Sequence, residues 1–510
     1  MPRFVEFSTN FSTGELDPLL RARVDLQAYG NALAKATNVL IQPQGGLRRR
    51  PGLKHILELP NTSTASAGNG VRLVPFQFSV DDSYMLCFTH NRMYVIKNGA
   101  VVANINASGN NYLTTTIGSS ILSNMCWTQS ADTLIIVHPD MQPVKLVRGA
   151  SDSSWTISTI TFDSVPKYAF TIAYSNPSTT LTPSAVSGNV TLTAGVATFN
   201  SGHVNQYINV SPQGRARIVE YVSTTVVKAI TEYPFFDITA KASGSWELET
   251  GYEDVWSSTR GWPRSVTFHE GRLYFGGSKS RPSTVWGSKI GLFFDFVPSE
   301  SLDDDAVEAT LDTNELNVIT DIVSSRDFQV FTTGGEFYVP QQGTDPITPL
   351  TFTFKNVSRN GIKPGTRVQS VESGSVYIQR QGKSLNEFVF SDTQLTYITQ
   401  RISLLSGHLL KNPQRIALRK ASSTDESDLL MMTNTTDGSM AVFSIMRSQQ
   451  ITAPSEFTTD GEFIDVGVDV TQIYAVTKRV FNSTTKYFIE QFKDDLYTDC
   501  AFVEIGRAHV

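Results

Sequence analysis

Hydrophobic and polar residues follow a helical period only within the first 60 residues of this chain. Asp17 followed by Pro18 is a typical helix start, because the aspartate caps the first turn and proline suits the first helical position. Four downstream residues with apolar side chains recur at helical spacing: Leu26, Tyr29, Leu33 and Ala36. The pattern predicts a short helical segment in this part of the chain.

Beyond residue 60 the period changes to two, which is typical of β-strands. Seven stretches each show two apolar-aromatic runs around a polar or glycine turn, such as Asn98-Gly99, Gly334-Gly335 or Asp437-Gly438. They read MLCFTHNRMYVIKNGAVVANI, TLIIVHPDMQPVKLV, SVTFHEGRLYFGG, FQVFTTGGEFYVP, SVYIQRQGKSLNEFVF, LLMMTNTTDGSMAVFSI and QIYAVTKRVFNSTTKYFIEQF. Each stretch is predicted to form a β-hairpin.

Hairpins spread along most of the chain favour radial repetition of small antiparallel sheets. We therefore predict a mainly β fold with β-propeller-like repeats of antiparallel hairpins. The spacing of the hairpins is irregular, so it does not define the number of blades. A sandwich built from similar hairpins is the alternative.

One block departs from the hairpin rhythm. Residues 169–250 are rich in Ser, Thr and Val and poor in charge, which predicts an all-β insertion between propeller segments. A structural role suits this block better than sugar binding, because it shows no evident cluster of aromatic residues for stacking on sugars. The predicted organisation is a helical docking segment (1–60), a first propeller part (61–168), the insertion (169–250), the rest of the propeller (251–503) and a terminal tail (504–510).

Composition and charge narrow the class of protein. The 510 residues are 40% hydrophobic and 18% charged, with a formal net charge of -6, so the chain is expected to be globular. Residues 1–60 hold eight Lys and Arg against five Asp and Glu, which gives an acidic body a basic start. The three cysteines are far apart, which argues against a disulfide scaffold and a structural zinc site. No apolar run approaches the about 18 residues that a membrane-spanning helix needs.

The basic start contains three consecutive arginines, Arg48, Arg49 and Arg50, between a Gly-Gly pair and Pro51-Gly52. The flanking residues restrict the backbone, which lowers the entropy lost when these side chains bind a fixed partner. We expect them to form ion pairs with carboxylates of a neighbouring subunit or ring. Binding to the phosphates of passing DNA is the competing interpretation.

A run of carboxylates, Asp303, Asp304 and Asp305, is the other charged candidate. It has the residue types for binding a hard cation or for acid-base chemistry. Neighbouring residues of an extended chain point to opposite faces, however, so the three cannot easily converge on one substrate. We expect a solvated loop or an ion-pair site between subunits.

Sequence motifs of enzymes are missing. The chain contains no HExxH, GxSxG, GxxxxGK[ST] or GxGxxG, and its seven histidines lie at no metal-ligand spacing. We therefore predict no catalytic residue, no metal site and no cofactor, and we expect that the protein is not an enzyme.

Three motifs at the start of the chain resemble the N-terminal signature of the tail nozzle (tail tubular protein B) family of short-tailed bacteriophages. They are Gly-Glu-Leu-Asp-Pro at 14–18, Arg-Val-Asp-Leu-Gln-Ala-Tyr at 23–29, and the Pro-x-Gly-Gly to Arg-Pro-Gly turn at 43–52. The similarity continues through most of the chain and is specific again from Trp256 to Val339, whereas the insertion resembles the family weakly.

The resemblance implies a structural virion protein of the phage tail, made in the host bacterial cytoplasm. Such a subunit would join a ring-shaped homo-oligomer, expected to be a hexamer, and contact the adaptor (gatekeeper) ring and tail fibres. Genomic DNA would pass through the lumen without sequence-specific binding, and an acidic body suits a conduit that must not grip a polyanion. The alternative function is a β-propeller tail protein that binds or degrades glycans.

The end of the chain departs from the family, whose members commonly run longer. Residues 504–510, EIGRAHV, can be encoded by a sequence that resembles a common sequencing adapter. We expect this stretch to be a non-native tail of a truncated gene; the alternative is a natural end.

Overall fold

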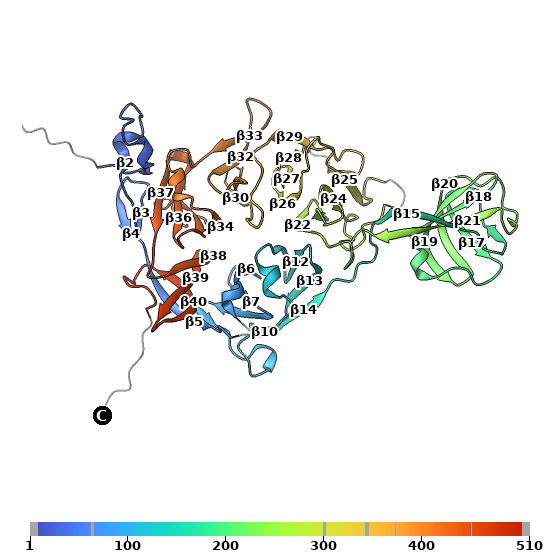
Figure 1. Ribbon diagram of the computed structural model, residues 1–510, viewed down its shortest axis with the longest axis horizontal. Helices are drawn as coiled ribbons and strands as arrows, with labels where there is room; N and C mark the ends of the chain where they lie inside the picture. The colour runs from blue at the N-terminus through green and yellow to red at the C-terminus, as the bar shows by residue number, and fades with distance from the viewer. Residues whose placement is uncertain are drawn as a thin grey trace, which may run out of the picture.

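A computed structural model describes residues 9–62, 66–298, 302–341, 346–372, 374–449 and 451–501. Residues 504–510, expected to be a non-native tail, lie outside this part of the chain. The fold is a β-propeller of seven antiparallel sheets arranged around an axis, with one further sheet projecting from it (Figure 1). The predicted propeller class is confirmed.

The first three blades come from the first half of the propeller, and each is named here by its position in the chain. Blade 1 consists of β6 (Arg72–Gln77), β7 (Ser83–Thr89), β8 (Arg92–Lys97), β9 (Ala100–Val101) and β10 (Leu113–Thr114). Blade 2 consists of β11 (Cys126–Ser130), β12 (Thr133–His138), β13 (Met141–Arg148) and β14 (Trp155–Thr159). Blade 3 consists of β22 (Ser265–His269), β23 (Arg272–Gly276), β24 (Thr284–Gly287) and β25 (Val307–Thr310).

The next three blades follow without interruption. Blade 4 consists of β26 (Ile319–Ser324), β27 (Phe328–Thr332), β28 (Glu336–Val339) and β29 (Lys355–Ser358). Blade 5 consists of β30 (Gln369–Val371), β31 (Gly374–Ile378), β32 (Leu385–Ser391) and β33 (Thr396–Arg401). Blade 6 consists of β34 (Pro413–Arg419), β35 (Asp428–Asn434), β36 (Met440–Met446) and β37 (Ile451–Phe457).

Blade 7 closes the ring with strands from both ends of the chain. It consists of β38 (Glu462–Asp469), β39 (Gln472–Phe481), β40 (Thr484–Lys493) and β5 (Gly52–Leu59), in which β5 pairs antiparallel with β40. All seven predicted hairpins are present, one in each blade. The alternating runs therefore mark the blades correctly.

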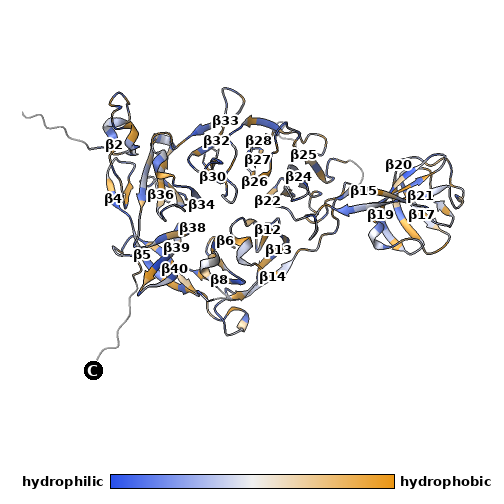
Figure 2. Cartoon of the chain, viewed as in Figure 1, coloured by the Kyte–Doolittle hydropathy of each residue, from blue (hydrophilic) through white to orange (hydrophobic). Residues whose placement is uncertain are grey.

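Neighbouring blades pack face to face through apolar side chains. Between blades 7 and 1, for example, Tyr474 and Ile489 share a core cluster with Leu73 and Met85, and all four are buried. Because both faces of a blade are covered, its middle strands are buried almost throughout, as in Leu86, Cys87 and neighbouring residues of β7. Figure 2 shows the mixture of apolar and polar residues on the strands of each blade.

Between blades 2 and 3 the chain forms a separate seven-stranded sheet with its own core. Its strands are β15 (Lys167–Ser175), β16 (Leu181–Pro183), β17 (Asn189–Ala194), β18 (Tyr207–Val210), β19 (Arg215–Ser223), β20 (Val226–Tyr233) and β21 (Trp246–Asp254). Its core cluster draws only on this sheet and its loops, with Leu192, Ile218 and Trp246 among the buried residues. In Figure 1 this module projects from the ring at the right.

The N-terminal segment is less helical than the apolar spacing predicts. It contains two short 3-10 turns, η1 (Pro18–Leu20) and η2 (Tyr29–Asn31), and the short strands β1 (Gly14–Glu15), β2 (Ala32–Leu33), β3 (Val39–Ile41) and β4 (Leu47–Arg49). Asp17 does cap η1, since its carboxylate accepts a hydrogen bond from the Leu19 amide at 2.9 Å.

A continuous helix does not follow η1, because the segment pairs its ends as parallel strands instead. Gly14 and Glu15 of β1 are opposite Ala32 and Leu33 of β2, and the Glu15 carboxylate accepts a hydrogen bond from the Ala36 amide at 2.6 Å. A short amphipathic helix gains most of its stability from packing one face on a core, and this segment instead lies along the edge of β37.

The other helical elements of the described residues are single turns in loops. They are η3 (Ala67–Asn69), η4 (Ile105–Ala107), α1 (Ser119–Leu122), η5 (Ser201–His203), η6 (Gly407–Leu409) and η7 (Arg447–Gln449). No helix in the described part of the chain is long and apolar enough to span a membrane.

Candidate functional site

The three consecutive arginines have different environments. Arg48 and Arg49 are exposed on β4, where Arg48 lies 3.4 Å from the Asp494 carboxylate and Arg49 donates to the Tyr497 carbonyl and stacks on the ring of that tyrosine. Arg50 is buried. Its guanidinium donates to both carboxylate oxygens of Asp499, at 2.9 and 2.6 Å. The expected contact with a partner subunit thus has two exposed arginines available to it, while Arg50 is bound within the chain.

The run of three aspartates surrounds a buried arginine with backbone carbonyls. The Arg272 guanidinium donates to the carbonyl oxygens of Asp303 and Asp304, at 2.6 and 3.3 Å, and to that of Asp305. The side chains of Asp303 and Asp304 are exposed, whereas Asp305 is buried and accepts a hydrogen bond from the Ala306 amide at 2.9 Å. The three carboxylates therefore do not converge on one point.

The structure does not bring these two predicted groups together. The arginines lie beside blade 6, and the aspartates precede β25 in blade 3, on the other side of the ring (Figure 1). Their role as interface residues stays a prediction. No group of His, Cys, Asp and Glu in the described residues has the arrangement of a metal site.

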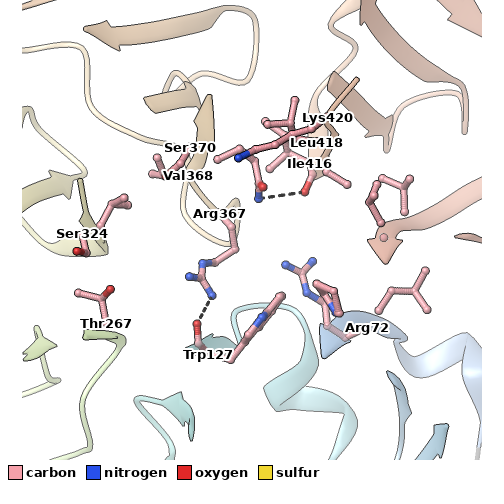
Figure 3. Close-up of a pocket in the computed structure, with 18 of the residues that line it drawn as sticks. Arg72, Trp127, Thr267, Ser324, Arg367, Val368, Ser370, Ile416, Leu418 and Lys420 are labelled. Carbon is pink, nitrogen blue, oxygen red and sulfur yellow. Dashed lines mark hydrogen bonds between the residues drawn. The ribbon is translucent and has the colours of Figure 1, made fainter. Parts of the chain in front are cut away.

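A cavity of about 450 Å³ lies on the propeller axis, and it was not predicted from the sequence. All seven innermost strands contribute to its wall, from β6, β11 and β22 to β26, β30, β34 and β38. Figure 3 shows Arg72, Trp127 and Arg367 in this cavity, with Thr267, Ser324, Ser370 and Lys420 around them. Closure of the ring is what brings these distant residues together.

Two buried aspartates join neighbouring blades next to this cavity. Asp321 of β26 accepts hydrogen bonds from Arg367 Nε at 2.9 Å and from the Val368 amide at 3.0 Å, just before β30. Asp465 of β38 accepts from the Leu73 amide of β6 at 2.8 Å. Because these carboxylate oxygens are already bound to backbone amides, both aspartates have a structural function at blade junctions.

Arg72 is a buried side chain of the cavity wall with nitrogen atoms that lack hydrogen-bond partners. It is 4% exposed, and its Nε and Nη1 atoms have no hydrogen-bond partner. The Asp465 carboxylate is 4.0 Å from Arg72 Nη1 and 3.8 Å from Arg415 Nε, so one carboxylate lies between two guanidinium groups. The guanidinium carbon of Arg72 lies 5.0 Å from the centroid of the Trp127 ring, and that of Arg367 lies 4.8 Å from it.

Charge around Arg72 is unbalanced toward the positive. Burial, together with the charges of Arg415 and Arg367, lowers the pKa of Arg72 to about 9, although Asp465 acts in the opposite direction. A buried guanidinium normally has its donors satisfied, because an unpaired buried charge is costly. The arrangement can therefore accept an anion.

The three arginines of this cluster lie far apart in the sequence, near the innermost strands of three different blades. Arg72 begins the innermost strand of blade 1, Arg367 comes just before that of blade 5, and Arg415 is in that of blade 6. Each alone looks like an ordinary charged residue next to a strand.

Comparisons with known proteins do not assign this chain to a family. No protein-family model matches the sequence, and no curated protein matches it significantly. Among solved structures, the phage phi92 endosialidase is 10% identical with a TM-score of 0.28, covering 90% of this chain and 71% of its own. A GH43 β-1,3-galactosidase with galactodeoxynojirimycin is 8% identical with a TM-score of 0.22, covering 44% and 89%. BBS1N in complex with ARL6DN is 7% identical with a TM-score of 0.29, covering 88% and 99%.

Proposed function

We propose that this protein is a structural virion protein, a subunit of the tail nozzle of a short-tailed bacteriophage. It would form a ring, a hexamer, that contacts the adaptor ring and tail fibres and lets genomic DNA pass through its lumen. The N-terminal signature motifs support this function, and one structural observation about the same segment carries it.

That observation is the exposure of apolar side chains in the N-terminal segment. Its backbone is fixed to blade 6, because Asn38 donates to the Glu456 carbonyl at 2.7 Å and Glu456 donates to that of Ala36 at 2.9 Å. Leu19 and Val24 nevertheless remain 89% and 72% exposed. A well-anchored segment that leaves large apolar side chains in water is suited to burial against another protein.

The projecting module offers a further surface for neighbours. Tyr233 ends β20, Phe236 and Ile238 follow in the next loop, and the three side chains are 65%, 67% and 53% exposed. Exposed aromatic residues of this kind are enriched at protein interfaces. A subunit with contacts at both the N-terminal segment and the module has two separate surfaces with which to build a ring.

Assembly of the purified chain tests the proposal. Negative-stain images and sedimentation of the full chain, alone and mixed with an adaptor ring, should show rings or nozzle-like stubs. Leu19→Ser combined with Val24→Ser should prevent assembly while leaving the thermal unfolding midpoint unchanged. Leu395→Ser is the matched control, since Leu395 is 77% exposed in blade 5 and should not affect assembly. Assembly that is indifferent to the double change would contradict this use of the segment.

The alternative, a propeller that binds or degrades glycans, is favoured by the axial cavity. Glycan hydrolysis typically uses two carboxyl groups that flank the scissile bond. Among the described residues that line the cavity, none is Asp or Glu. The second candidate function is therefore glycan binding rather than cleavage, and retention of the purified chain on immobilised host polysaccharide would test it.

A further inference from the structure

The wall of the axial cavity contains a cationic group, Arg72, whose Nε and Nη1 atoms have no hydrogen-bond partner. Arg367 is neutralised by Asp321, with an Nε to Oδ2 distance of 2.9 Å. Arg415 donates to the carbonyls of Ser123 and Gly365, at 3.0 and 3.4 Å. Arg72 has neither a hydrogen-bonded carboxylate nor a carbonyl, and its guanidinium points into the cavity (Figure 3).

The charges fix the kind of ligand that balances the site. Three guanidinium groups, of Arg72, Arg367 and Arg415, face two carboxylates, of Asp321 and Asp465, which leaves one positive charge in excess. An anion neutralises this excess of positive charge, because an unpaired buried charge is costly. A carboxylate also matches the planar fork of a guanidinium.

The rest of the wall suits a hydroxylated ligand. Hydroxyl and amide groups of Thr267, Ser324, Ser370 and Gln369 line the cavity together with apolar surface from Pro75. A volume of about 450 Å³ lies within the range of small-molecule sites. Polar groups arranged around an apolar wall fix the orientation of a ligand rather than only its charge.

We propose that the axial cavity is a binding site for a hydroxylated carboxylic acid of sugar-acid type, with Arg72 as the residue that binds the carboxylate. Lys420 lines the same cavity and adds a second positive charge near the ligand. The proposal rests on the glycan-binding function and deepens it, because it names the kind of sugar unit, an acidic one, that such a glycan would present. It is independent of ring assembly.

Trp127 supplies the readout. The guanidinium groups of Arg72 and Arg367 lie 5.0 and 4.8 Å from the centroid of its indole ring. A ligand bound to Arg72 would therefore change the surroundings of this ring and its fluorescence. The full chain would be titrated with sodium D-glucuronate, with D-glucose as the neutral counterpart and with inorganic phosphate. Tryptophan fluorescence and calorimetry would be followed together, and Trp127→Phe would show whether the optical signal arises from this residue.

We expect glucuronate to bind with a millimolar or lower Kd and glucose to bind much more weakly. Arg72→Met should weaken glucuronate binding by about tenfold to a hundredfold, as expected for the loss of a charge-assisted hydrogen bond. Arg326→Met is the matched control, because Arg326 is exposed in a loop of blade 4 and pairs only distantly with Asp392, at 3.8 Å. Arg72→Lys keeps the charge without the fork and should show an intermediate loss, which also covers the case in which Arg72→Met does not fold.

Several results would overturn the proposal. Glucuronate binding that is absent, or equal in the wild-type chain and in both Arg72 variants, would assign Arg72 a purely structural role at the blade junction. Phosphate that binds while glucuronate does not would replace the carboxylate by a phosphate group and refute the assigned ligand class. Failure to bind polysaccharide with retained binding of glucuronate would reject the glycan-binding function while leaving the cavity site in place.

Discussion

Arg50 and Asp499 form a two-pronged ion pair that joins the N-terminal segment to the end of the described chain. The guanidinium donates to both carboxylate oxygens, at 2.9 and 2.6 Å, and also to Asn38 and to the Thr458 carbonyl. Burial raises the pKa of Asp499, but the hydrogen bonds from Arg50 and Thr459 outweigh this, so that the pKa is lowered. The pair connects the strand that closes the propeller with segments at blades 6 and 7.

Arg50→Ala should therefore destabilise the protein, whereas Arg48→Ala and Arg49→Ala should not. Removing one partner of a buried pair leaves the other charge uncompensated, which costs about 3 kcal/mol of unfolding free energy. Exposed pairs such as that of Arg48 contribute less than about 1 kcal/mol. Urea unfolding of the three single variants checks this. Equal stability of all three would show that the Arg50 pair does not stabilise the closure of the ring.

Assembly into the tail, in contrast to stability, should depend on Arg48 and Arg49. If the exposed arginines bind carboxylates of a neighbouring subunit, Arg48→Ala combined with Arg49→Ala gives a stable chain that fails to join the tail. Incorporation into virions, measured by quantitative mass spectrometry, checks the result. Particles that carry the double variant but eject DNA abnormally would instead place these arginines in the DNA channel.

Arg272, rather than the neighbouring aspartate side chains, should determine the stability of the loop before β25. Its guanidinium binds the carbonyls of Asp303, Asp304 and Asp305, and it is 1% exposed. Arg272→Met should lower the unfolding free energy by about 2 to 4 kcal/mol, because the carbonyls lose their donors. Asp303→Asn with Asp304→Asn should change it by less than about 0.5 kcal/mol, since both side chains are exposed. A larger effect of the aspartate variant in thermal unfolding would contradict this.

His138 should make the fold less stable in mild acid. Burial, with the nearby charges of Arg264 and Lys279, lowers the pKa of this imidazole to about 4, while Asp140 acts in the opposite direction. Its Nδ1 accepts a hydrogen bond from the Asp140 amide at 3.1 Å, which requires the neutral ring. The unfolded chain takes up a proton at His138 below a pKa of 6.5, whereas the folded chain does so only near 4.

Stability from the neutral ring is thus fully present above pH 6.5 and is lost as the pH falls toward 4, by about 3 kcal/mol in total. Denaturant unfolding from pH 7 to pH 4 measures it. The carboxylates of the chain titrate in both the wild-type protein and His138→Gln. The difference between their unfolding free energies therefore isolates the contribution of His138. Parallel curves for the two proteins would show that His138 is protonated equally in both states.

The hairpins were predictable because they depend on local signals, namely alternation and turn residues such as Asn98-Gly99. The blade number was not, because some strands carry little local signal. β30 has only three residues, and β5 joins blade 7 from the other end of the chain. The axial cluster was beyond prediction for the same reason: Arg72, Arg367 and Arg415 become neighbours only after the ring closes. The prediction of an N-terminal helix was wrong, because helical spacing of apolar residues alone does not supply a core against which a helix packs.

The last prediction concerns the projecting module, which should fold by itself and be removable. Lys167 and Asp254 are direct partners on β15 and β21, and the Val255 amide donates to the Pro166 carbonyl at 2.9 Å, so the two chain ends lie side by side. The module buries Trp246 and its other core residues within its own sheet and loops. Residues 166–255 expressed alone should therefore unfold cooperatively on heating. The chain in which a short glycine-serine linker replaces residues 168–253 should keep the unfolding midpoint of the propeller, because loop closure is inexpensive when the ends are already adjacent. Calorimetry of both proteins, compared with two transitions in the full chain, measures this. A module without cooperative unfolding, or a propeller that aggregates without it, would show that the two parts fold as one unit and that the module contributes to the propeller rather than to contacts outside it.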